Sequence, residues 1–171
     1  IFEAGISCPN EMVNLENIIH PTFGVFTNIG AAHEANFTSR DEKVKEKLQL
    51  FDHVDNLVYC KDYPELSAAV DAKQFNHAQL RRFSWSRKTK ADLQIARVTK
   101  KADECEIQAV YDNRFISIRI PFTDEASIEN AIHFDATNPQ PESMLNHFEN
   151  AQQTRCQLRR LHPAPKLGIG S

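Results

Sequence analysis

The sequence GVFTNIGAAHEANF, residues 24–37, determines the fold that we expect. Its first part, GVFTNI (24–29), is apolar and β-branched, which predicts a buried strand. A short loop separates this strand from TSRDEKVKEKLQLF (38–51), in which Thr38 or Ser39 can act as the N-cap and acidic residues occupy the first turn. Apolar residues recur in this second sequence at spacings of four and three, so we expect an amphipathic helix after the strand and its loop.

The same alternation of strand and helix continues on both sides of residues 24–51. Upstream, IFEAGI (1–6) predicts a strand and residues 9–19 predict a helix. Downstream, NLVYC (56–60) predicts a strand, and YPELSAAVDAKQF (63–75) predicts a helix with a proline near its start. Short connections between alternating strands and helices are typical of α/β proteins, so we expect a mostly parallel sheet flanked by helices.

After residue 80 the pattern changes to alternating apolar and polar residues. This alternation, with YDNR as a turn, predicts a small antiparallel sheet attached to the parallel one. Its strands are RRFSW (81–85), LQIARVTK (93–100), ECEIQAVYD (104–112) and RFISIRIP (114–121). A helix is expected from near Ala126, and another over residues 141–153. We therefore expect one α/β domain over residues 1–153 and a poorly ordered tail over residues 154–171.

Composition narrows the classes of protein to which the chain can belong. The 171 residues carry a formal net charge of −3, so no basic surface for nucleic acid is expected. No apolar run approaches the roughly eighteen residues that a membrane helix requires, and the opening sequence is unlike a signal peptide. Scattered cysteines without a CxxC pair are typical of buried, reduced thiols. Together these features predict a cytoplasmic protein without membrane insertion.

Three ionisable residues lie in or near the predicted strands, where α/β proteins usually build their sites. Glu3 lies within the apolar strand 1–6, where an unpaired carboxylate is costly and requires a cation or a donor. His33 follows the strand 24–29, and Lys47 lies fourteen positions later on the helix. Taken alone, a loop histidine is usually structural and a helix lysine is usually solvated, so this spacing by itself is weak support for a site.

Three strings in this order resemble the middle domain of the Mur ligase family: EAG (3–5), TNIGAAH (27–33) and EKVKEKLQLF (42–51). That family carries an E[AM]G strand, an NIGxAHxExF segment and then a lysine-bearing helix. The resemblance covers residues 1–133 and implies the ATP-handling domain of the family. The most similar branch adds D-alanyl-D-alanine to UDP-N-acetylmuramoyl-tripeptide.

The resemblance implies roles for five residues. Glu3 and His33 would hold the Mg²⁺ ions that bridge the phosphates of ATP. Lys47 would be carbamylated, which turns a cation into an anionic oxygen ligand for the second ion, so His33 and Lys47 are the expected catalytic residues. The string DEASIENAIH resembles a family helix whose asparagine approaches the adenine, which implies Asn130 as a nucleotide contact beside Asn28 of the TNIG string.

The reaction implied by the resemblance is phosphoryl transfer from ATP to a peptide carboxylate, which gives an acyl phosphate that the amine of the dipeptide attacks. ATP and a UDP-muramyl peptide are therefore the expected partners. Two alternatives stay open: a non-catalytic module that binds a partner or has a structural role, and a related ligase that uses another amino acid.

The sequence also departs from the family pattern. It contains no GxxGK[ST] phosphate-binding loop, which the family carries upstream of the EAG strand. The acidic residue expected two positions after the histidine is Ala35 here, and Glu34 comes one position earlier. We interpret the chain as a truncated domain that lacks the loop and the family's N-terminal and C-terminal domains, and we expect it to be inactive alone.

Overall fold

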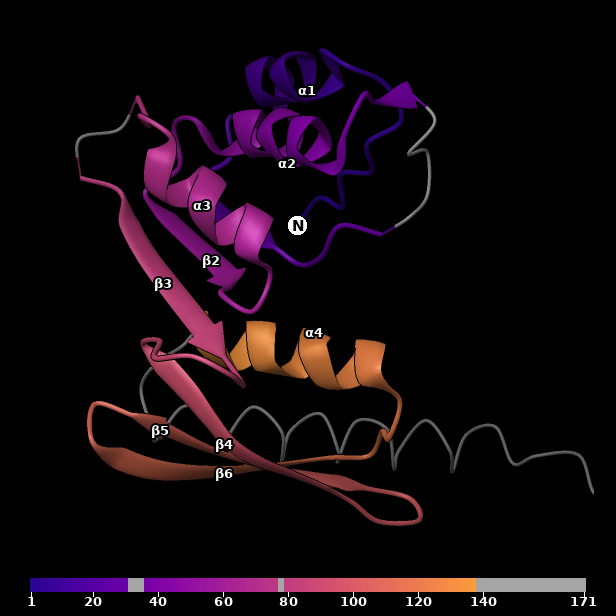
Figure 1. The fold of residues 1–171 in the computed structure, drawn as a ribbon, viewed down its shortest axis with the longest axis vertical. Helices are drawn as coiled ribbons and strands as arrows, with labels where there is room; N and C mark the ends of the chain where they lie inside the picture. The colour runs from indigo at the N-terminus through magenta and orange to yellow at the C-terminus, as the bar shows by residue number, and fades with distance from the viewer. Residues whose placement is uncertain (31–35, 77–78, 138–171) are drawn as a thin grey trace, which may run out of the picture.

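A computed structural model describes residues 1–30, 36–76 and 79–137 of the chain (Figure 1). The strands are β1 (Phe23–Phe26), β2 (Asn56–Cys60), β3 (Arg81–Ser86), β4 (Leu93–Lys100), β5 (Cys105–Tyr111) and β6 (Arg114–Ile120). They form one sheet in the order β1-β2-β3-β4-β5-β6. Neighbours pair in parallel from β1 to β4, and β4, β5 and β6 pair antiparallel. The predicted α/β architecture with an attached antiparallel sheet is confirmed.

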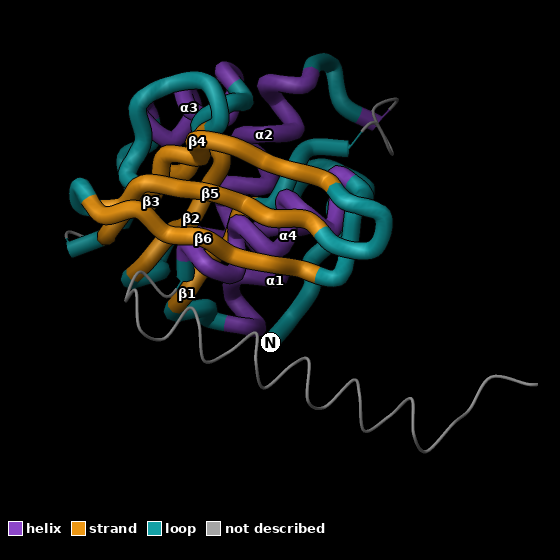
Figure 2. Tube along the Cα trace, turned by 90° about the horizontal axis from the view of Figure 1, so that it is seen from below, coloured by secondary structure: helices purple, strands orange, loops and turns teal. Residues whose placement is uncertain are grey.

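Helices cover both faces of this sheet. They are α1 (Glu11–Ile19), α2 (Arg40–Leu48) with its 3-10 continuation η2 (Gln49–Phe51), α3 (Pro64–Ala72) and α4 (Glu125–Ala136). The first three helices lie together on one face, and α4 lies on the other face, above the antiparallel strands in Figure 1. Figure 2, seen from below, shows β5 and β6 running across α4.

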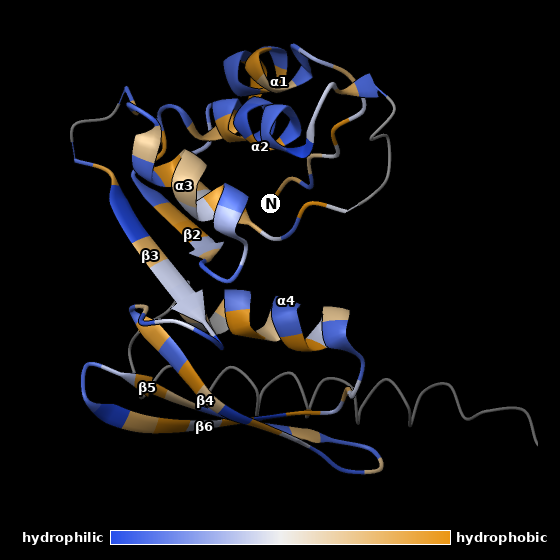
Figure 3. Ribbon diagram, in the orientation of Figure 1, coloured by the Kyte–Doolittle hydropathy of each residue, from blue (hydrophilic) through white to orange (hydrophobic). Residues whose placement is uncertain are grey.

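Strand β2 separates two apolar clusters. Leu57 and Tyr59 belong to the cluster with α1, α2 and α3, whereas Val58 and Cys60 belong to the cluster with α4. Successive side chains of a strand point to opposite faces, so a strand buried on both faces has a continuous apolar sequence. In contrast, the antiparallel strands alternate apolar and polar residues along their length (Figure 3), because only one of their faces is buried.

The close packing of η2 on β1 requires a glycine. A Cβ atom at Gly24 would lie 2.5 Å from Cδ1 of Phe51, which is closer than two carbon atoms can approach. The ring of Phe51 also packs against that of Phe26, with the centroids 6.1 Å apart. The absence of a side chain at residue 24 therefore allows η2 to lie directly on β1.

The expectation of a strand over residues 1–6 is wrong. These residues have no regular secondary structure, and among the described residues no strand pairs with them. Strands exist through hydrogen bonds to a neighbouring strand, and an apolar sequence cannot supply that neighbour. Ile1 and Phe2 are consequently exposed, whereas Ile6 is buried with α1 and α2.

The placement of residues 81–85 in the antiparallel sheet is also wrong. β3 runs parallel to β2, with Asn56 opposite Arg81 and Cys60 opposite Trp85. Its last residues also pair in parallel with the start of β4, Trp85 opposite Leu93. Helix α3 carries the chain back along the sheet, so the next strand runs in the same direction as β2. The alternation of apolar and polar residues carries no information about strand direction.

Several local expectations are confirmed. Ser39, not Thr38, is the N-cap of α2, and its hydroxyl accepts a hydrogen bond from the backbone N–H of Glu42 at 3.1 Å. Asp112 and Asn113 adopt positive φ of 48° and 60° in the two-residue turn between β5 and β6. The helix expected over 141–153 and the tail over 154–171 lie outside the described residues.

Two further predictions concern the cysteines and membrane insertion. The free thiols of Cys60 and Cys105 are buried as expected, whereas Cys8 is exposed, which corrects the expectation for that residue. No helix within the described ranges is long and apolar enough to cross a membrane.

Candidate functional site

Three basic side chains of α2 converge on the segment that follows β1. Nη2 of Arg40 donates to the carbonyl of Ile29 at 3.3 Å, and Nζ of Lys43 donates to that of Gly30 at 2.8 Å. Nζ of Lys47 donates to the carbonyl of Asn28 at 3.2 Å. Residues at spacings of three and four lie on one face of a helix, so α2 presents these groups as a row along residues 28–30. The row therefore ties the predicted catalytic lysine to the predicted nucleotide-contacting segment.

The environment of Lys47 lowers the pKa of its amine. Burial lowers the pKa of its amine first, and the positive charge of Lys43 lowers it further, while the carboxylate of Glu3 raises it. Nζ of Lys47 also lies 5.1 Å from the ring centroid of Phe26. Desolvation and a like charge both disfavour an ammonium ion. The lowered pKa makes the neutral amine of Lys47 easier to reach than that of a solvated lysine.

Of the other two expected metal ligands, Glu3 lies within the described residues and His33 does not. Glu3 is exposed and not within an apolar strand, so the premise that its carboxylate is buried is wrong, although its charge acts on Lys47. His33 lies outside the described residues. Within the described parts of the chain, no three His, Cys, Asp or Glu side chains are close enough together to hold a metal ion. Lys47 is thus joined to Asn28 by a hydrogen bond and influenced by the charge of Glu3.

On the opposite face of the sheet, His133 of α4 connects β3 to the residue that follows β1. Its Nδ1 accepts a hydrogen bond from Nε1 of Trp85 at 3.1 Å, and its Nε2 lies 3.0 Å from the carbonyl oxygen of Thr27. The two rings meet edge-on with their centroids 5.1 Å apart. His133 is 2% exposed, and burial lowers its pKa to about 4, partly offset by the bond to Thr27. The imidazole is therefore neutral over most of the pH range.

Asn130 lies on the exposed side of the same helix, one turn before His133. Its neighbour Glu129 accepts a hydrogen bond from the hydroxyl of Tyr63 at 3.2 Å. Burial and the charge of Glu129 together raise the pKa of Tyr63 to about 12. Asn130 itself is accessible to a ligand, and no hydrogen bond within the described residues joins it to Lys47.

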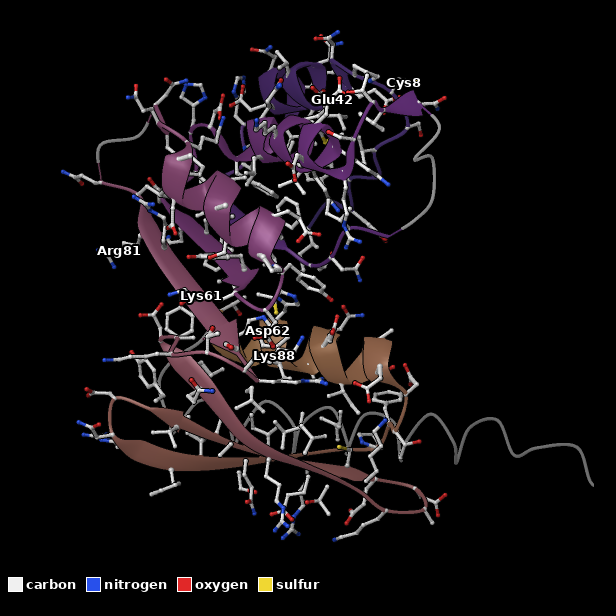
Figure 4. All side chains as sticks on the ribbon, in the orientation of Figure 1. Cys8, Glu42, Lys61, Asp62, Arg81 and Lys88 are labelled. Atoms are coloured by element: carbon white, nitrogen blue, oxygen red, sulfur yellow. The ribbon has the colours of Figure 1, made fainter. Side chains whose placement is uncertain are left out.

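Asp62 organises the loop that follows β3. Its carboxylate accepts hydrogen bonds from the hydroxyl of Ser86 and from the backbone N–H groups of Arg87 at 2.9 Å and Lys88 at 3.2 Å. Nη1 of Arg87 reaches Oε2 of Glu125 in the first turn of α4 at 2.9 Å. Asp62 and Lys88 accordingly lie side by side where β2 and β3 end (Figure 4). This network fixes α4 to the ends of the parallel strands.

A pocket of about 390 Å³ opens beside the start of α2. Its lining is formed by Phe37, Thr38, Ser39, Arg40 and Lys43. Nε of Arg40 also forms an ion pair of 2.7 Å with Glu65, and Lys43 donates to the carbonyl of Gly30. The pocket therefore adjoins the segment over residues 28–30 through two side chains of the basic row.

Sequence reasoning missed Arg40, Lys43 and His133. Arg40 lies seven positions and Lys43 four positions before Lys47, which places all three on one helix face, and this spacing was a usable signal. His133 follows Asn130 by three positions, but its two partners are distant in sequence. No pattern in the sequence could have identified Trp85 and Thr27 as the partners of His133.

Comparisons with known proteins identify the family and the fold of the domain. A sequence profile of the Mur ligase middle domain matches residues 1–134. No curated protein matches the chain significantly. A crystal structure of MurF from Acinetobacter baumannii has a TM-score of 0.64 at 19% identity, over 80% of this chain and 29% of that one.

Two further solved structures have the same fold. MurF from Thermotoga maritima in complex with ADP has a TM-score of 0.59 at 17% identity, over 72% of this chain and 28% of that one. A mutant of L. casei FPGS has a TM-score of 0.60 at 16% identity, over 77% of this chain and 31% of that one. The chain thus spans less than a third of the length of each of these relatives. The profile match covers most of the chain, and we conclude that it belongs to the Mur ligase family and folds as the middle domain of that family.

Proposed function

We propose that the chain is the middle part of an ATP-dependent amide ligase of peptidoglycan precursor synthesis. The substrate would be a UDP-N-acetylmuramoyl-tripeptide to which D-alanyl-D-alanine is added through an acyl phosphate. The observation that carries the proposal is the convergence of α2 on the segment after β1, within a chain of this family. The N-terminal and C-terminal ligase domains would come from a longer protein, and the reaction would take place in the cytoplasm.

The carboxylate of Glu3 has the oxygen chemistry that suits the metal implied by the family. Mg²⁺ prefers oxygen ligands, which Glu3 offers directly and which a carbamylated Lys47 would offer as well. When bound, the ions would neutralise the negative charge on the phosphates of ATP. Asn28 and Asn130 would contact the nucleotide, and His33 would complete the set of metal ligands. Mg²⁺ binding and each of these roles are part of the proposal.

The lowered pKa of Lys47 supports its carbamylation. The neutral amine attacks the carbon of carbon dioxide, so a nitrogen–carbon bond forms and one carbon–oxygen double bond becomes a single bond. A proton then leaves the nitrogen, and the product is a carbamate anion. The negative charge of the carbamate would also be attracted to Lys43 and to a nearby metal ion.

The experiment that tests the function uses the longer ligase that carries this domain. Phosphate release would be measured with ATP, Mg²⁺, a UDP-muramyl tripeptide and D-alanyl-D-alanine. We expect Lys47→Ala to lower turnover by on the order of a hundredfold, as is usual when a group that stabilises developing charge is lost. Added acetate should partly restore the activity, because it supplies an anionic oxygen ligand.

Lys45→Ala is the matched control, because Lys45 is an exposed lysine of the same helix outside the row and should leave turnover unchanged. His33→Ala should abolish turnover without unfolding the protein. If Lys47→Ala kept full activity and ignored acetate, the carbamate would be refuted.

Two alternatives have some support. The FPGS structure and that of a UDP-N-acetylmuramoyl-L-alanyl-D-glutamate–2,6-diaminopimelate ligase have the same fold, which favours a ligase that adds another amino acid. Exchange of the amine substrate in the same assay would identify this ligase. A non-catalytic module is favoured by Ala35, which stands where the family has an acidic residue. Absence of nucleotide binding by the longer protein would support that alternative.

A further inference from the structure

The side chain of His133 forms two hydrogen bonds, one in which it must accept and one in which it must donate. Nε1 of a tryptophan can only donate, so Nδ1 of His133 must be the acceptor in the bond from Trp85. The proton of the neutral ring then lies on Nε2, which donates to the carbonyl of Thr27. Trp85 thereby selects the tautomer of His133 that can bind the end of β1.

Thr27 immediately precedes the segment that α2 holds from the other side. The row of basic side chains binds the carbonyls of Asn28, Ile29 and Gly30, whereas His133 binds the carbonyl of Thr27. Four consecutive carbonyl groups are therefore held from two helices on opposite faces of the sheet. The conformation of residues 27–30 consequently depends on both helices.

Helix α4 also carries the proposed nucleotide contact. Asn130 precedes His133 by three residues, so the two lie on neighbouring turns of one rigid element. A displacement of α4 would move Asn130, and through His133 it would also move the segment that holds Asn28. The hydrogen bonds thus connect the nucleotide side of the proposed site to the segment bound by Lys47.

We propose that His133 is a positioning residue that sets residues 27–30, and with them Asn28 and Lys47, relative to Asn130. The inference rests on the proposed function for its catalytic meaning. A purely packing role would require only an apolar ring of similar size at residue 133. The specific role requires an acceptor for the indole N–H of Trp85, which is 1% exposed, and a donor for the carbonyl of Thr27.

The test compares three variants of the 171-residue chain by backbone amide NMR of residues 28–30 and by tryptophan fluorescence. Trp85 is the single tryptophan, so the emission comes entirely from the residue that donates to His133. We expect His133→Gln to keep the wild-type amide positions, since a glutamine amide supplies both an acceptor and a donor. His133→Phe should shift the amide signals of residues 28–30 and the emission of Trp85.

His133→Asn separates the two bonds and remains informative if His133→Phe does not fold. Its shorter amide keeps an acceptor near Trp85 but cannot reach Thr27, so the amides of residues 28–30 should shift while the emission changes little. Ile132→Val is the matched control, because Ile132 is also fully buried on α4 but makes no polar contact. Wild-type amide positions in His133→Asn, or equal shifts in Ile132→Val, would overturn the proposal.

This readout involves neither nucleotide nor metal, so it distinguishes the two hypotheses. Shifted amides together with an inactive longer ligase would refute the proposed function and keep the positioning role. Unshifted amides, together with a longer ligase whose activity depends on Lys47, would refute the positioning role and keep the proposed function.

Discussion

Burial controls the protonation of individual residues in this domain. The amine of Lys47 and the imidazole of His133 both have lowered pKa values, and desolvation is the main cause for each. The consequences differ because their partners differ. Lys47 faces a like charge and the carboxylate of Glu3, whereas His133 contacts a tryptophan donor and a carbonyl acceptor.

The pKa of His133 predicts acid sensitivity. It lies at about 4 in the folded protein against a usual value of 6.5, so between these pH values the unfolded chain binds a proton that the folded chain does not. Stability should therefore fall as the pH drops from 6.5 towards 4, by about 3 kcal/mol for this group, and the effect should stop below pH 4. Urea unfolding of the wild type, followed by Trp85 fluorescence at several pH values, measures this loss of stability.

His133→Gln provides the reference, since glutamine does not titrate while the carboxylates are unchanged. The difference in unfolding free energy between wild type and variant should decrease as the pH falls through this range. An unchanged difference would show that the bonds of His133 do not depend on its neutral form.

Residue types alone could suggest only part of the site. Lys47 was predictable because the motif spacing places it fourteen positions after His33. The pairing of His133 with Thr27 spans 106 positions and depends on where α4 crosses the sheet. Glu3 was assigned to the site from the motif, but its expected burial was wrong because residues 1–6 form no strand among the described residues.

At the scale of the elements, α2 has the strongest local signals. Ser39 caps its N-terminus, and two acidic residues occupy its first turn, where they interact favourably with the helix dipole. The same helix carries the row of basic residues along its length, from Arg40 at its start to Lys47 in its last turn. Its start and orientation therefore determine where the proposed catalytic lysine lies.

Removal of the cap should be measurable. Ser39→Ala deletes the acceptor for the backbone N–H of Glu42 and should lower the free energy of unfolding by about 1 kcal/mol. Ser39→Asp retains an acceptor and should stay near the wild type. Chemical unfolding followed by circular dichroism tests both variants. Equal losses for alanine and aspartate would mean that the serine contributes something other than the cap.

At the scale of the whole molecule, one sheet joins two apolar clusters. Leu57 lies in the cluster with α1, α2 and α3, and Ile107 lies in the cluster with α4, both fully buried. β2 contributes to both clusters through alternate residues. The clusters should therefore unfold together even though they lie on different faces.

Substitutions in either cluster should shift one common transition. Leu57→Ala and Ile107→Ala should each cost about 2–5 kcal/mol, as is usual for buried large-to-small changes. Trp85 lies in the α4 cluster, so its fluorescence and far-ultraviolet circular dichroism should give the same midpoint in both variants. Ile18→Ala, at a residue 76% exposed, serves as the control and should change stability little. A Trp85 transition unaffected by Leu57→Ala would instead indicate two independent units.

The sequence by itself determined the order of the helices and the later strands, the cap of α2, the β5–β6 turn and the family. These features depend on local periodicity, on capping and turn chemistry, and on motif spacing, all of which involve residues that are close in the chain. Only the tertiary structure decided that β3 runs parallel to β2, that residues 1–6 remain outside the sheet, and that His133 meets Trp85 and Thr27. Strand pairing and buried polar contacts join residues far apart in sequence, so they are specified only when the helices pack and the two faces of the sheet become buried.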